Sequence, residues 1–267
     1  MDTSNRPGGF FLIGGKSNTC YATFVELAGG PDAHIVIIPH ASGIPVEAAA
    51  DVVEAFARLG ATNVAVLKSP SRFAVKVATA LWKLGAKRLS RLVSGARIPD
   101  GTNAVYISGG DQGRLVEKLG PGGIEALEAF HAAGGLIAGT SAGAACMGNY
   151  MIDGGMKDGG MKDGVIRANS LLTAKGLGLT KRIAFDTHMW RDRYNRPIVA
   201  LAILDIDAVF GLDEDTGVYI KDGIAVVYGV ANVWYYRRCA DFNVDFSAGS
   251  AHGVDVIVRT AGGVFTI

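Results

Sequence analysis

The first 150 residues of the chain alternate short apolar runs with amphipathic segments. The apolar runs cover residues 9–15, 34–40, 63–68, 104–110 and 135–141. Between them, apolar residues recur with helical spacing at 46–60, 74–95 and 123–134. Short buried strands that alternate with such helices predict βαβ units, and therefore a largely parallel sheet with helices on both faces.

Beyond about residue 170 the pattern changes to strands joined by glycine-containing turns. Strand-like runs occur at 183–189, 208–214, 217–223, 224–236 and 254–267. Strands that follow one another through short turns pair antiparallel or form a β-rich flank. We therefore predict an α/β fold with a largely parallel central sheet and antiparallel C-terminal strands, in a single domain over residues 1–267.

A short duplication, GGMKDGGMKDG, separates these two parts at residues 154–164. Its five glycines disfavour a helix and predict a mobile surface loop. Such a loop is either a plain connection or a lid over a nearby site.

Composition and charge narrow the possible partners. Hydrophobic residues make up 49% of the chain and charged residues 19%, a low charged share that favours an oligomer with buried surface. The net charge is +1, which supplies no global field for nucleic acid or an anionic membrane. We expect neither as a partner, and any recognition of charge must be local.

The sequence shows no membrane-spanning segment, no secretory signal and no cysteine pair. The apolar stretches fall short of the roughly 20 residues of a membrane-spanning helix, and MDTSNRPGG does not resemble a secretory signal. We therefore predict a soluble, cytoplasmic protein. Cys20, Cys146 and Cys239 are odd in number and form no CxxC pair, so we interpret them as buried thiols.

The segment GLIAGTSAGAACM surrounds Ser141 with small residues. Gly139 to Gly143 fit the G-x-S-x-G pattern of a strand-to-helix turn that exposes a nucleophilic serine. The apolar strand before it and the helix-compatible residues after it favour this interpretation. A tight packing turn with an unreactive serine is the alternative.

A nucleophilic serine needs a base and a carboxylate that orients the base. His34, His131 and His252 occupy positions typical of structural histidines, whereas His40 and His188 follow apolar runs at predicted strand ends. His188 lies in FDTHMWRDRYNR among carboxylates and guanidinium groups, which favours it as the base.

Three acidic residues are candidates for the orienting carboxylate: Asp186, Glu214 and Asp215. Asp186 is two residues from His188, so in a strand both side chains would share one face. Glu214 closes another apolar run. Spacing alone leaves the choice open.

Arg191, Arg193 and Arg196 follow His188 directly. Guanidinium groups bind carboxylates in a bidentate geometry, so the cluster indicates a substrate with acidic groups or a free C-terminus. Pairing with neighbouring aspartates is the structural alternative.

Two other segments resemble ligand loops only superficially. IGGKS at residues 13–17 would need glycine at position 10 to form a phosphate loop, and Phe10 stands there. The duplication at 154–164 lacks the ligand spacing of a calcium loop. We predict no metal and no cofactor.

Taken together, these segments resemble the cyanophycinase and dipeptidase E family of serine peptidases. GTSAGA at 139–144 is similar to the family's nucleophile turn, and SGGDQ at 108–112 to its preceding glycine turn. DTH at 186–188 with the trailing arginines is similar to its base segment, and GLDEDTG at 211–217 to its acid segment. The four occur in the family's order.

This resemblance implies a set of catalytic roles. Ser141 would be the nucleophile, His188 the general base and Glu214 the orienting carboxylate. The backbone N–H groups of Gly110 and Ala142 would form the oxyanion hole.

The resemblance also implies a substrate and a fold. The substrate pocket would be lined by Gln112, Asp186, Arg191, Arg193 and Arg196. Family members hydrolyse peptides after aspartyl residues, and cyanophycinases release β-Asp-Arg dipeptides from cyanophycin, a poly-aspartyl-arginine polymer. The implied fold is a Rossmann-like three-layer sandwich, often a homodimer, that needs no cofactor.

Three alternatives remain at this point. The protein could be an aspartyl or isoaspartyl dipeptidase of the same family, or a non-catalytic relative that binds a small molecule at the same strand ends. A glutamine amidotransferase would normally have cysteine in place of Ser141.

Overall fold

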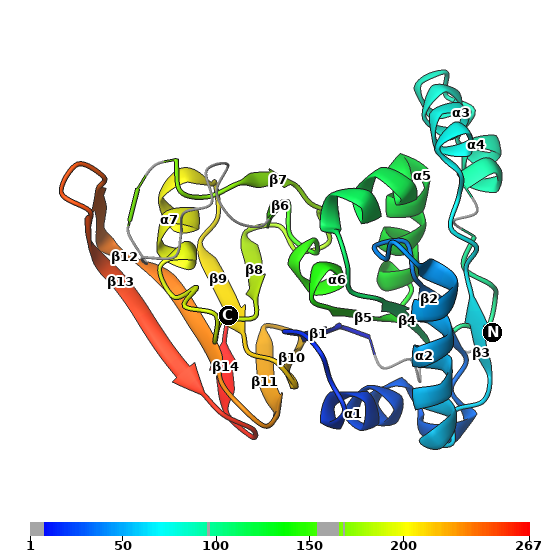
Figure 1. Ribbon diagram of the computed structural model, residues 1–267, viewed down its shortest axis with the longest axis horizontal. Helices are drawn as coiled ribbons and strands as arrows, with labels where there is room; N and C mark the ends of the chain where they lie inside the picture. The colour runs from blue at the N-terminus through cyan, green and yellow to red at the C-terminus, as the bar shows by residue number, and fades with distance from the viewer. Residues whose placement is uncertain (1–7, 95–96, 154–165, 168) are drawn as a thin grey trace.

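A computed structural model describes residues 8–94, 97–153, 166–167 and 169–267. The predicted loop at 154–164 lies outside these residues, so its role as a lid stays a prediction. Figure 1 shows an α/β arrangement, with helices around one end of a large sheet and a second sheet at the other end.

The large sheet has eight strands in the order β14-β11-β10-β1-β5-β4-β2-β3. Its parallel part contains β1 (Phe10–Ile13), β5 (Leu136–Thr140), β4 (Ala104–Ile107), β2 (Ile35–Ile38) and β3 (Val64–Val66). Its antiparallel part contains β10 (Thr216–Lys221), β11 (Ile224–Gly229) and β14 (Val264–Thr266). The predicted parallel sheet with antiparallel C-terminal strands is confirmed.

Alternating residues of the parallel strands bury two separate faces. Phe11, Ile13 and Tyr106 pack with α1 (Thr19–Ala28) and α2 (Pro45–Arg58). Phe10, Leu12 and Ile107 pack on the other face with α5 (Gln112–Ala132) and α6 (Ala142–Ala145). Because strand side chains point alternately up and down, one sheet is covered twice, which produces the three layers.

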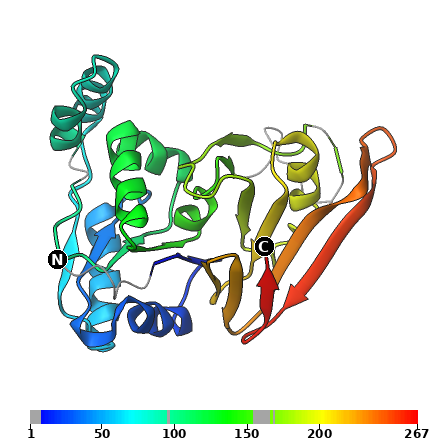
Figure 2. The ribbon, with the colours of Figure 1, turned by 180° about the vertical axis from the view of Figure 1, so that it is seen from behind.

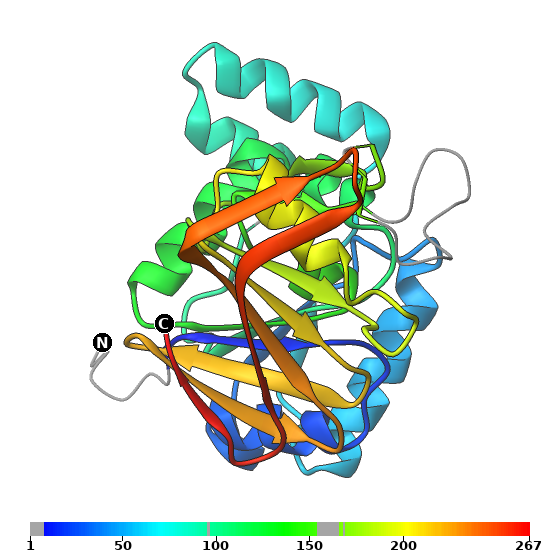
Figure 3. The ribbon, with the colours of Figure 1, turned by 90° about the vertical axis from the view of Figure 1, so that its left-hand side faces the viewer.

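A second sheet covers the antiparallel part on the α5 and α6 side. Its order is β13 (Ser250–Arg259), β12 (Val233–Asp245), β9 (Ala208–Leu212) and β8 (Ile183–Thr187). Phe185, Phe210 and Tyr235 join the core on that face. On its far side the sheet packs against α7 (Arg196–Ile203), and Figure 3 shows its long β12–β13 hairpin toward the viewer.

The remaining elements are short or project from the body. β6 (Tyr150–Ile152) and β7 (Thr173–Lys175) form a two-stranded ribbon, and a 3-10 turn, η1, covers Gly30–Asp32. The helices α3 (Arg72–Lys83) and α4 (Lys87–Ser94) stand out from the body, far from the β12–β13 hairpin (Figures 1 and 2).

Three sequence predictions need correction. The single helix expected over 74–95 is two helices, because Gly85 takes a left-handed conformation (φ +79°) that ends the first one. The helix expected from residue 123 begins at Gln112 and is kinked at Gly120, before Pro121. Cys239 is exposed, whereas Cys20 and Cys146 are buried as predicted.

No helix in the described ranges has the length and hydropathy needed to cross a membrane. The prediction of one domain over residues 1–267 stays a prediction.

Candidate active site

Ser141 stands at the end of β5, between β1 and β4, in a strained backbone conformation (φ 50°, ψ −114°). Its backbone N–H donates to the carbonyl of Ile13 at 2.9 Å. A Cβ on Gly139 would lie 2.3 Å from the carbonyl oxygen of Gly143, and a Cβ on Gly143 would lie 2.4 Å from that of Ile107. The glycines therefore allow the close backbone contacts that hold this turn.

His188 follows β8 in the second sheet and reaches across to Ser141. Its Nε2 atom lies 2.7 Å from Ser141 Oγ, and its φ of 58° turns the side chain away from the path of the strand. Its backbone N–H donates to the carbonyl of Gly14 at 3.2 Å, which ties the end of β8 to the end of β1.

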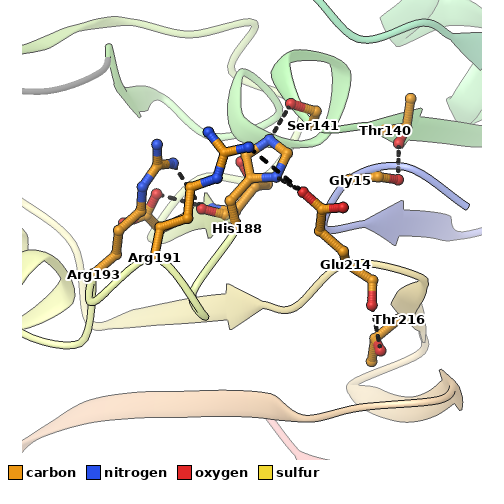
Figure 4. A network of polar contacts seen from close by, with 10 residues as sticks. Gly15, Thr140, Ser141, His188, Arg191, Arg193, Glu214 and Thr216 are labelled. Carbon is orange, nitrogen blue, oxygen red and sulfur yellow. Dashed lines mark hydrogen bonds and ion pairs between the residues drawn. The ribbon is translucent and has the colours of Figure 1, made fainter.

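Glu214 approaches the other nitrogen of the same imidazole from the loop after β9. His188 Nδ1 lies 2.9 Å from Glu214 Oε1. With the proton on Nδ1, that N–H donates to the carboxylate and leaves Nε2 free to accept from the hydroxyl of Ser141. Figure 4 shows the ring between the hydroxyl and the carboxylate.

Gly15 forms the wall against which the imidazole and the carboxylate pack. A Cβ there would lie 2.7 Å from His188 Cε1 and 2.9 Å from Glu214 Cγ. The carbonyl of Gly15 also accepts from Thr140 Oγ1 at 2.8 Å. The segment IGGKS was interpreted only as a failed phosphate loop, and this role of Gly15 was not predicted. The signal was the glycine pair directly after the first strand.

Burial lowers the pKa of His188, and the positive charges of Arg193 and Arg191 lower it further, against the opposing effect of Glu214. Burial alone would raise the pKa of Glu214, but hydrogen bonds from His188 and Trp190 and the charge of Arg191 bring it below its ordinary value. At neutral pH the imidazole is therefore neutral and the carboxylate ionised, the states that a general base and its orienting acid require.

The turn after β4 stands directly beside the serine. A Cβ on Gly109 would lie 3.3 Å from Ser141 Cβ, and Gly110 has a φ of +143°. Within the described part of the chain, the backbone N–H groups of Gly110 and Ala142 donate to no acceptor. The turn that carries Gly110 thus lies beside Ser141, and the role of Gly110 and Ala142 as oxyanion donors stays a prediction.

The predicted pocket residues separate into two groups. Asp186 and Arg196 form an ion pair of 3.0 Å, with side chains only 3% and 5% exposed. Burial raises the pKa of Asp186, although the charge of Arg196 opposes this, and its Oδ1 accepts from the backbone N–H of Thr187 at 2.8 Å. This buried pair joins the two ends of the segment 186–196, which carries His188.

The other three predicted pocket residues are more exposed than this pair. Arg191 is about half exposed, with a terminal nitrogen 3.9 Å from Glu214 Oε1. Arg193 donates to the carbonyl of Thr187 at 2.9 Å. Gln112, at the start of α5, donates to the carbonyl of Ile152 at 2.7 Å.

The rival candidates have other structural roles. Asp215 accepts from the Ser17 and Thr19 hydroxyls and from backbone N–H groups at the start of α1, so it serves that helix. His40 is fully buried, and neither ring nitrogen has a hydrogen-bond partner in the described residues. Burial, with Lys118 nearby, lowers the pKa of His40 to about 4.

Among the described residues, no group of three or more His, Cys, Asp or Glu side chains could hold a metal ion.

Comparison with known proteins places the chain in a family. The model of peptidase family S51 matches residues 10–227, which include the serine, the histidine and the glutamate described above. The chain belongs to peptidase family S51. Cyanophycinases of Trichormus variabilis and of a Nostoc species are each 32% identical to this S51 peptidase over 231 residues, covering 83% of this chain and 71% of theirs.

Solved structures support the fold of this S51 peptidase. A peptidase from an acI-B1 actinobacterium superposes with a TM-score of 0.62 at 16% identity and covers 97% of both chains. A protein described as a peptidase E from Listeria monocytogenes superposes with a TM-score of 0.50 at 16% identity, covering 84% of this chain and 99% of its own.

Proposed function

We propose that the protein is a serine exopeptidase for aspartyl-linked peptides, with cyanophycin as substrate and β-Asp-Arg dipeptides as product. The observation that carries the proposal is the continuous hydrogen-bonded series from Ser141 Oγ through the imidazole of His188 to Glu214. The cyanophycinase relatives support the choice of substrate.

The reaction begins with proton transfer and attack. His188 Nε2 takes the hydroxyl proton while Ser141 Oγ bonds to the amide carbon on the acid side of an aspartyl unit. The carbonyl oxygen becomes an oxyanion and accepts hydrogen bonds from the free N–H groups of Gly110 and Ala142. Glu214 stabilises the imidazolium that forms.

The tetrahedral intermediate then collapses. The C–N bond breaks, His188 gives its proton to the leaving amine, and the acyl group remains as an ester on Ser141. A water molecule, deprotonated by His188, attacks the ester, and release of the acid returns the proton to Ser141.

The arginines supply recognition of acidic substrate groups. Arg191 is exposed beside Glu214, where it can bind a carboxylate that flanks the scissile bond. The buried pair of Asp186 and Arg196 positions the segment that carries both His188 and Arg191.

A panel of substrates tests the proposal. Wild type and Ser141→Ala are incubated with cyanophycin, with α-aspartyl dipeptides and with β-aspartyl dipeptides. The concentration of newly released amino groups is then measured. We expect wild type to release β-Asp-Arg from the polymer and the variant to be folded but inactive. Cleavage of dipeptides alone would indicate an aspartyl or isoaspartyl dipeptidase. Equal activity of both proteins would remove the serine mechanism, and inactivity of both would indicate a binding protein.

The predicted homodimer and the cytoplasmic location belong to the same proposal. Light scattering after size exclusion measures the mass directly, and a mass of twice the 27.8 kDa chain is expected.

A further inference from the structure

The carboxyl ends of the five parallel strands line one edge of the large sheet, in the order β1, β5, β4, β2, β3. Gly15, against which His188 packs, follows β1, and Ser141 follows β5. Gly110 follows β4. The base therefore lies on one side of the nucleophile, and the ends of β2 and β3 lie on the other side, beyond the oxyanion turn.

A cavity of about 500 Å³ opens at the ends of β2 and β3. Arg72, Arg114 and Lys118 contribute three positive charges to its lining, with Asp111 and Glu117 as the acidic members. The Asp111 carboxylate accepts from the backbone N–H of Arg114 at 2.6 Å, which fixes it at the start of α5.

The three cations lack carboxylate partners within the described chain. Arg114 Nη1 donates to the carbonyl of Ala41 at 3.0 Å, and Lys118 Nζ donates to Ser69 Oγ at 2.6 Å. Both contacts are to neutral oxygens, which fix the side chains without neutralising them. Three cations against the two carboxylates of Asp111 and Glu117 leave a net charge of +1 in the lining, which suits a carboxylate ligand.

The cavity and the oxyanion turn share a wall. The carbonyl of Ala41 accepts from Arg114 and from the backbone N–H of Asp111. The same carbonyl oxygen would lie 2.4 Å from a Cβ on Gly110. A chain bound in the oxyanion hole therefore has this cavity as its neighbour on the side away from His188.

We propose that this cavity is an acyl-side subsite that binds a carboxylate of the substrate chain several residues from the scissile bond. The inference rests on the proposed function, because His188 must face the leaving amine, which directs the acyl chain toward β2 and β3. Neighbouring strands are about 4.8 Å apart, so the cavity lies about 10–14 Å from Ser141. An extended chain covers that distance in roughly three to four residues.

The subsite gives the enzyme a preference for long acidic substrates over dipeptides. A dipeptide ends before the cavity, whereas an aspartyl polymer continues into it. The nearby Glu117 faces the same space, which allows a positive group on the substrate to bind beside the carboxylate.

Binding to an inactive protein tests the subsite separately from catalysis. In a Ser141→Ala background, tetra-aspartate and di-aspartate are titrated by calorimetry, with and without the substitutions R72Q and K118Q. We expect tetra-aspartate to bind at least tenfold more tightly than di-aspartate, and the double substitution to remove that advantage. Circular dichroism establishes that the variants are folded.

A matched control removes the same amount of charge from the α3–α4 pair, outside the cavity. Lys83 and Arg88 are exposed and line no part of this cavity, so K83Q with R88Q should leave the length preference intact. Equal loss in the control, no preference for tetra-aspartate, or no effect of R72Q and K118Q would each overturn the subsite. Failure of the proposed function would appear instead as lack of cleavage by wild type in the substrate panel.

Discussion

The two sheets of this protein contribute unequal parts of the site. The parallel part of the large sheet supplies Ser141 after β5 and the predicted oxyanion donor Gly110 after the neighbouring β4. The second sheet supplies His188 at the end of β8, and the loop between β9 and β10, which connects the two sheets, supplies Glu214. The hydrogen-bonded series of Ser141, His188 and Glu214 therefore extends from one sheet to the other.

Because the site residues come from two sheets, the contacts between the sheets affect the reaction. The turn that carries Ser141 is fixed within one sheet by glycines and by backbone hydrogen bonds. The position of the imidazole depends on how the second sheet packs, through the contacts of His188 with Gly14 and Gly15. Substitutions that loosen this junction should reduce activity while leaving the parallel sheet folded.

The largest effect is expected from Glu214→Gln. The amide cannot stabilise the imidazolium and favours the wrong tautomer of His188, so kcat should fall by roughly 10³–10⁴-fold. Steady-state kinetics on the preferred peptide measure this.

Asp215→Asn provides the matched control, because that neighbouring carboxylate serves the start of α1. It should cost about 1 kcal/mol of stability and leave kcat nearly unchanged. Equal losses of activity in both variants would contradict the assignment of Glu214.

The buried ion pair between Asp186 of β8 and Arg196 of α7 is expected to affect the stability of the protein. Asp186→Asn or Arg196→Met alone leaves one charged partner unpaired in the core, at a cost of about 3–5 kcal/mol in the free energy of unfolding. Urea denaturation measures this cost. The double variant should be less destabilised than the sum of the two, and strict additivity would show that the pair is not coupled.

At the junction itself, Gly15→Ala tests the contact between the sheets. The new Cβ would overlap the imidazole, displace it by a fraction of an ångström to an ångström and lower kcat by roughly 10²-fold. Gly113→Ala is the control, because its Cβ would lie 3.4 Å from Asp111 Oδ1, an ordinary contact. Full activity in Gly15→Ala would show that the ring position is not restrained there.

The smallest expected effect is a shift in pH dependence. The base must be neutral, so activity is lost as the pH falls through the pKa of His188, which lies below its ordinary value. Arg191→Gln removes one cause of that lowering and should move the acidic limb of the kcat profile to higher pH. Arg182→Gln, on the exposed surface, should leave the limb in place. A shift to lower pH in Arg191→Gln would contradict the electrostatic account.

Much of the fold was predictable from hydrophobic periodicity. The five parallel strands are short apolar runs in the sequence, and β1, β2, β4 and β5 are buried on both faces, whereas β3 at the edge is partly exposed. The assignment of β8, β9, β12 and β13 to a separate sheet was not predictable, since local patterns do not specify which strands pair. The break at Gly85 was missed because amphipathic spacing continues across it.

The candidate site was predictable to a similar degree. Local signals identified Ser141, and charge crowding favoured His188. The choice among three acids required the resemblance to known peptidases, because Glu214 and His188 are 26 positions apart. Gly15 was missed, since its role depends on a ring from a distant segment.

Labelling with a serine-directed phosphonate tests the central claim most directly. Mass spectrometry after digestion should locate one adduct on Ser141 in the wild type, and the labelling rate should fall by several orders of magnitude in His188→Ala, which lacks the base. An adduct on another residue, or equal labelling rates in the two proteins, would contradict the account.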